Sequence, residues 1–144
     1  MRTTRISLAL LALQAAVVGW WGLLAPRSFY DDFPGFGRHW VSLDGPYSEH
    51  LVRDVGSLFL ALLVVTAAAW AAAPAHRGPG RLVGLAWLAY AVPHLTYHYV
   101  HLDVFEPVDR VLNVVLLAVT VLLPAHLALA PGRRRREPVA AKAA

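Results

Sequence analysis

Three histidines, His94, His98 and His101, follow one another at steps of four and three residues in an otherwise apolar stretch of the chain. Because an α-helix turns by about 100° per residue, all three side chains project from one narrow strip of a helix. Imidazoles are the preferred nitrogen ligands of zinc, copper and iron, and they also carry protons. The spacing therefore predicts a metal site, an axial ligand site for haem, or a proton path on one helix face.

The rise of a helix limits which of these histidines can act together. His94 and His101 stand about 10 Å apart along the helix axis, which is too far for both to reach one metal ion. We therefore expect His98 and one neighbouring histidine to be ligands, and the remaining histidine to lie in a proton path.

A second polar group precedes the apolar stretch that begins near residue 51. His50 and Asp54 share one helix face, and Glu49 and Arg53 form a pair four residues apart with the carboxylate on the favourable N-terminal side. We expect His50 to join the three histidines as a candidate metal ligand. Glu49, Arg53 and Asp54 are candidates for groups that orient the ligands or carry protons.

Four further side chains are candidates for the same role of orienting the ligands or carrying protons. Asp109 and Asn113 repeat the four-residue step near the start of the last apolar stretch. Tyr90 and Tyr97 project within about 60° of His94 and supply phenol donors. These residues complete the candidate site, to which no catalytic residue and no reaction can be assigned from the sequence.

The same residues are open to a second interpretation. Buried histidines, carboxylates and an asparagine can hold helices together as a polar network or line a transport path, in a non-enzymatic membrane subunit or small transporter. An ionisable residue within a membrane indicates function without choosing between these roles. Binding of a transition metal, haem or quinone for electron or proton transfer is the first hypothesis, and the network is the alternative.

Four long apolar stretches must position these groups. Hydrophobic residues make up 58% of the 144-residue chain and charged residues only 15%, which is too apolar for an ordinary soluble domain of this size. Each stretch is long enough to cross a hydrocarbon core of roughly 30 Å. We predict an all-α, antiparallel bundle of four transmembrane helices in one domain over residues 1–132. The helices are expected at residues 6–25, 51–73, 82–102 and 108–130, and the aromatic-rich loop between the first two is expected to be partly ordered and extracytoplasmic.

Charge predicts the orientation of the bundle. The two termini and the turn between the second and third stretches together carry +8, whereas the opposite side carries −4, which recovers the net charge of +4. By the positive-inside rule both termini are cytoplasmic. The basic tail at 133–144 is expected to be disordered and to bind anionic lipids rather than nucleic acid. A membrane protein partner or a second copy of the chain would bind within the bilayer.

Composition narrows the remaining possibilities. The chain has no cysteine, which excludes disulfides, thiolate catalysis and cysteine-ligated clusters. Arginine outnumbers lysine twelve to one, which is typical of a high-GC bacterial genome and predicts a multi-pass protein of the bacterial plasma membrane.

Two segments, 46–56 and 93–102, resemble those of small, uncharacterised four-helix membrane proteins of actinobacteria. More distantly, the layout is similar to that of the DoxX-like superfamily of short four-helix membrane proteins. Some DoxX-like members are linked to quinone-coupled oxidation or to redox-stress complexes, so the resemblance implies a membrane bundle and an association with quinones. No DoxX-like motif corresponds to the histidines of this chain, and no site residue is carried over from that superfamily.

Overall fold

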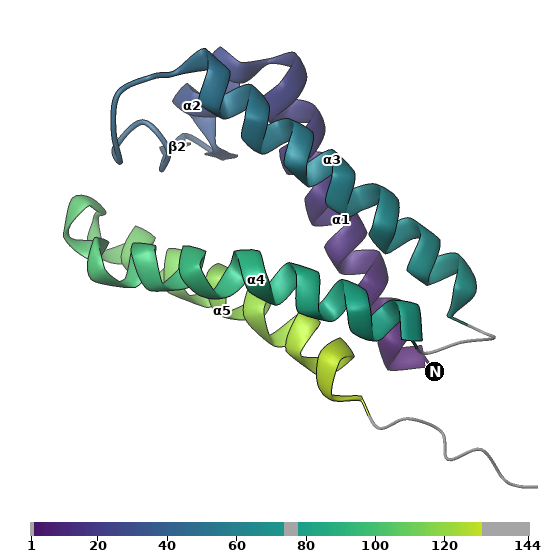
Figure 1. Cartoon of the computed structure of the whole chain (residues 1–144). Helices are drawn as coiled ribbons and strands as arrows, with labels where there is room; N and C mark the ends of the chain where they lie inside the picture. The colour runs from purple at the N-terminus through teal and green to yellow at the C-terminus, as the bar shows by residue number, and fades with distance from the viewer. Residues whose placement is uncertain (1, 74–77, 131–144) are drawn as a thin grey trace, which may run out of the picture.

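Long antiparallel helices make up most of the structure, a computed structural model that describes residues 2–73 and 78–130 (Figure 1). The elements are α1 (Arg2–Leu24), α2 (Pro26–Asp32), β1 (Pro34–Gly35), β2 (Arg38–His39), α3 (Glu49–Ala72), α4 (Gly78–Val100), a 3-10 turn η1 (Leu102–Val104) and α5 (Pro107–Leu129). The all-α prediction is confirmed, and the four long helices begin and end within a few residues of their predicted bounds. The predictions for the basic tail fall outside the described residues.

Three of the described helices, α1, α3 and α5, are long and apolar enough to cross a membrane. This finding indicates a membrane protein. α4 is 23 residues long, as α1 is, but it is not among these three helices. His94, His98 and Pro93 lie within α4, together with its tyrosines, and they lower its mean hydropathy. His94 and His98 therefore lie on the one long helix of the described residues that is not among the candidate spans.

The long helices form two pairs, α1 with α3 and α4 with α5. Figure 1 shows that the pairs come together at the end that carries the N-terminus and diverge toward the opposite end. Buried residues from all four helices, including Leu8, Ala69, Trp87 and Leu127, form a core that joins the two pairs. The structure is therefore V-shaped, with its main core near the narrow end.

Within each pair, glycines let the helix backbones approach closely. A methyl group at Gly56 of α3 would lie 2.5 Å from the backbone nitrogen of Leu23 and 2.9 Å from the carbonyl oxygen of Gly19, both in α1. In the second pair, a methyl group at Gly84 of α4 would lie 2.7 Å from the carbonyl oxygen of Pro124. Small residues at helix contacts are typical of membrane bundles, where van der Waals packing drives association.

A segment at residues 26–48, here called the cap, lies at the wide end of the V (Figure 1). It contains α2 and the β1–β2 hairpin, in which Pro34 pairs with His39. Pro26 begins α2, a position that suits proline because its missing N–H would have no partner there. Arg27 hydrogen-bonds to Asp31 at 2.7 Å, and this contact raises the pKa of Arg27, which stays charged. The expected partly ordered loop thus contains a helix that the sequence analysis did not predict.

Candidate functional site

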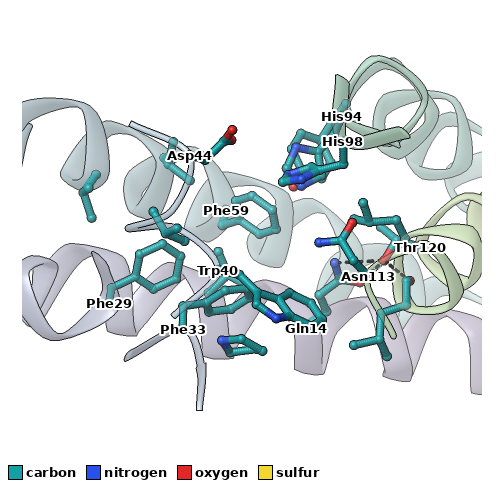
Figure 2. A pocket seen from close by; sticks show the side chains of 18 of the residues that line it. Gln14, Phe29, Phe33, Trp40, Asp44, Phe59, His94, His98, Asn113 and Thr120 are labelled. Carbon is teal, nitrogen blue, oxygen red and sulfur yellow. Dashed lines mark hydrogen bonds between the residues drawn. The ribbon is translucent and has the colours of Figure 1, made fainter. Parts of the chain in front are cut away.

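A cavity of about 640 Å³ lies between the two helix pairs, toward the cap. All four long helices and the cap contribute to its walls, and most of the lining side chains are apolar. Figure 2 shows His94, His98, Asn113, Thr120 and Gln14 on one side of the cavity, whereas Phe29, Phe33 and Asp44 lie toward the other. The cavity volume falls in the range of small-molecule binding sites, roughly 300–1,000 Å³.

Two of the predicted histidines, His94 and His98, line this cavity together from α4 (Figure 2). Their ring centroids are 4.6 Å apart with the rings nearly perpendicular, as the four-residue step predicts. Tyr90, one turn earlier, stacks on His94 at 4.9 Å between centroids and also lines the cavity. These three side chains form a continuous polar and aromatic wall on α4.

α5 faces this wall with Asn113 and Thr120, which are both buried. The amide nitrogen of Gln14 in α1 donates a hydrogen bond to the hydroxyl of Thr120 at 3.3 Å. The hydroxyl of Thr120 also lies 3.0 Å from the carbonyl oxygen of Leu116, one turn earlier in α5. Gln14 and Thr120 therefore connect the two helix pairs across the cavity.

Several contacts hold the cap against the ends of α4 and α5. Arg38 of β2 forms an ion pair with Asp109 at the start of α5. The hydroxyl of Tyr97 donates to a carboxylate oxygen of Asp44 at 3.2 Å, and the ring of Trp40 packs edge-on against Phe105. The cap thus bridges the wide end of the V from one helix pair to the other.

Three buried polar atoms at the cavity have no hydrogen-bond partner among the described residues. They are Nδ1 of His98, Oδ1 of Asn113 and Nε1 of Trp40. Leaving a buried polar group without a partner costs about 1–3 kcal/mol, so native proteins usually satisfy such groups with water or a ligand. Three such groups from two helices and the cap mark this cavity as the candidate binding site.

Other predicted site residues lie outside the cavity lining. His50 is 84% exposed, with its Nε2 atom 3.3 Å from the carboxylate of Asp54, and neither residue lines the cavity. Glu49 and Arg53 form the predicted pair at 2.8 Å, and Arg53 also donates to the carbonyl oxygen of Leu23. This second group therefore lies on the surface of α3, where it connects α3 to the end of α1.

His101 also departs from the predicted strip. α4 ends at Val100, so the helical periodicity that placed His101 beside His94 no longer applies. Its ring stacks instead on Tyr97 at 4.2 Å between centroids, and its Nδ1 atom lies 2.7 Å from the carbonyl oxygen of Tyr97. Tyr97 and Asp109, which were expected to support the histidines, bind the cap.

The metal-site prediction requires several ligand side chains around one point. Among residues 2–73 and 78–130, no group of three histidine, aspartate or glutamate side chains is placed to hold one metal ion. His94 and His98 alone supply two nitrogen ligands, fewer than the three or four protein ligands usual for zinc. The two imidazoles are better suited to hydrogen-bond a small polar group within the cavity.

The sequence analysis missed four residues of this region, namely Gln14, Arg38, Trp40 and Asp44. Gln14 carried a usable signal, because it is the one polar amide inside an apolar stretch of about 20 residues. Arg38, Trp40 and Asp44 lie in a loop without helical periodicity, so no sequence pattern could predict that they lie near the histidines.

The fold indicates a helical membrane protein, and the mainly apolar cavity between its two helix pairs is a candidate binding site. The chain belongs to the family described as "Domain of unknown function (DUF4345)", whose family model matches residues 3–101. The match includes the cap and the histidine wall of α4 and ends before α5. Neither the curated proteins nor the solved structures include a match to this chain.

Proposed function

We propose that this protein binds a small amphipathic molecule of the quinone class in the cavity between its helix pairs. The observation that carries the proposal is a largely apolar cavity in which His98 and Asn113 each present a buried polar atom without a partner. A quinone ring suits the apolar walls, and its oxygens suit the polar side. The resemblance of the chain to DoxX-like proteins points the same way.

The chemistry assigned to the histidines is hydrogen bonding and proton exchange. A neutral imidazole has one N–H donor and one acceptor nitrogen, so His94 and His98 can each donate to a quinone oxygen or accept from a quinol hydroxyl. The amide of Asn113 can do either on the opposite wall. Proton transfer by His94 or His98 would accompany a change in the redox state of the bound ring.

The proposed topology follows the charge distribution. Alongside α1, α3 and α5 we assign α4 as a fourth span, because α4 packs antiparallel along α5 and has the same length. Both termini are then cytoplasmic in a bacterial plasma membrane, the cap is extracytoplasmic, and the cavity lies in the outer half of the membrane. The basic tail binds anionic lipids on the inner face.

A second candidate function is supported by the ion pair between Arg38 and Asp109. This pair and the bond from Tyr97 to Asp44 connect segments far apart in the sequence and occupy side chains that a bound cofactor would otherwise use. In this candidate the chain is a non-enzymatic membrane subunit, and its polar groups hold the bundle together for a partner or a second copy.

Purification in mild detergent tests the first candidate. An organic extract of the wild-type protein is expected to contain a stoichiometric quinone, identified by its ultraviolet spectrum and mass, and His98→Ala should lose it. His50→Ala is the matched control, because His50 is exposed and lies away from the cavity. If the protein instead contained stoichiometric metal or showed a haem absorption band, metal or haem binding would take the place of quinone binding. Protein free of quinone, metal and haem would favour the role as a subunit.

A further inference from the structure

Exposed apolar side chains line the cavity on two sides of the V. They are Leu51 and Val55 of α3 on one side, and Leu10 of α1 with Leu116 and Val119 of α5 on the other. Leu51 and Val55 are 62% and 40% exposed. Neighbours cover most of a side chain in the wall of a closed cavity, so exposed fractions this large mean that the cavity is not closed at these two residues. The cavity is therefore open to the surroundings next to the first two turns of α3.

The opening ends where α3 and α4 come into contact. The ring of Phe59 in α3 packs edge-on against Tyr90 and Trp87 of α4, with centroid distances of 5.0 and 5.9 Å. Further along, the indole N–H of Trp87 donates to the hydroxyl of Thr66 at 2.9 Å. From Phe59 toward the cap, Figure 1 shows the two helices diverging.

The residues across this opening are His94 and His98. The opening therefore leads from the apolar flank of α3 directly to the polar side of the cavity. We propose that it is a lateral opening to the bilayer, through which a quinone-class ligand with a hydrocarbon tail enters. The polar ring reaches His94 and His98 while the tail passes Leu51 and Val55 into the acyl chains. This inference rests on the function proposed above and specifies the class of ligand.

The other side of the V is less suited to this role. Gln14 of α1 and Thr120 of α5 hydrogen-bond to each other across the gap between those helices. A tail that passed there would have to separate two polar side chains that satisfy each other. Leu51 and Val55 are apolar, so passage of a tail between α3 and α4 breaks no hydrogen bond. The groups suited to bind the ring lie across the opening from them.

Two probes distinguish ring binding from tail passage: a benzoquinone that carries a decyl chain and the same benzoquinone without the chain. Their affinities are measured by calorimetry on the full chain in detergent. Val55→Trp places an indole in the opening and should weaken binding of the decyl probe by at least about ten-fold, a loss of about 1.4 kcal/mol. Binding of the tailless probe to this variant should match that of the wild-type protein.

Leu58→Trp is the matched control, since Leu58 is 66% exposed on α3 but does not line the cavity, and both affinities should stay unchanged. Leu51→Trp repeats the test in case Val55→Trp does not fold, as judged by gel filtration. Equal effects on both probes, or none on either, would overturn the lateral opening while leaving quinone binding intact. Binding of neither probe to the wild-type protein would overturn the proposed function and the opening together.

Discussion

Two kinds of helix contact coexist in this molecule. Within the pairs α1–α3 and α4–α5, backbones meet at glycines so closely that a single methyl group at Gly56 or Gly84 would collide with the partner backbone. Between the pairs, at the wide end, the helices enclose a cavity at which three buried polar atoms have no partner among the described residues. The difference suggests a division of roles: close contacts within the pairs hold the helices rigidly, and the space between the pairs is the site at which we propose that a ligand binds.

The largest effect is expected from Gly56→Ala. Alanine normally stabilises a helix interior by about 1 kcal/mol relative to glycine, but here its methyl group would lie 2.5 Å from the backbone nitrogen of Leu23. The helices must separate, so we expect the free energy of unfolding to fall by about 2–3 kcal/mol, measured by thermal or denaturant unfolding in detergent.

Gly80→Ala is the control for this substitution. Among the described residues, the nearest atom to a methyl group at Gly80 is a side-chain carbon of Thr4 at 3.9 Å, an ordinary van der Waals contact. Its stability should be equal to or above that of the wild-type protein. If Gly56→Ala proved as stable as Gly80→Ala, the close approach of α1 and α3 would not be the source of rigidity.

The next effect concerns the ion pair that holds the cap across the wide end. The side chains of Arg38 and Asp109 are 30% and 16% exposed, so Asp109→Asn should cost about 1–3 kcal/mol, between the values for surface and buried pairs. A double-mutant cycle with Arg38→Met measures the coupling. Glu49→Gln is the control, because it breaks the exposed pair with Arg53 and should lower the free energy of unfolding by less than about 0.5 kcal/mol. If Asp109→Asn and Glu49→Gln lowered it equally, Arg38 would not anchor the cap.

A smaller loss is expected at the contact between α3 and α4. Thr66→Val keeps the shape of the side chain but leaves the buried indole N–H of Trp87 without its acceptor. Hydrogen bonds between membrane helices contribute about 0.6 kcal/mol on average and at most about 1.7, and we expect a destabilisation in this range. Thr96→Val is the comparison, because the Thr96 hydroxyl bonds only to its own helix and is exposed, so the unfolding midpoint should not move.

The smallest change in stability, and the opposite sign, is expected for Asn113→Leu. Leucine is similar in size and removes a buried amide oxygen that has no partner, so the unfolding free energy should stay constant or rise by up to about 1 kcal/mol. Quinone content of the purified protein should fall at the same time. A variant that is clearly destabilised would show that Asn113 serves the packing of the bundle rather than a ligand.

The comparison also explains which parts of the molecule were predictable. Long apolar stretches predicted the helices, because the signal is local and each stretch is long enough to cross a membrane as a helix. The four-residue step from His94 to His98 is also a local signal, and it predicted their shared face. It failed at His101, since α4 ends one residue earlier. Glu49 and His50 were expected at the site with the histidines of α4. The rotation of α3 about its axis instead leaves His50 on the surface.

The sequence by itself therefore determined the four helices, the apolar character that indicates a membrane protein, and the pairing of His94 with His98 on one face. Only the tertiary structure decided that the helices pair off into a V and that the cap bridges its wide end through Arg38 and Asp109. It also decided that Gln14 and Trp40 join His94, His98 and Asn113 at one cavity. The reason is physical. Helix periodicity is set by hydrogen bonds four residues apart, whereas helix rotation and spacing depend on close contacts between residues distant in the chain, such as Gly56 and Gly19.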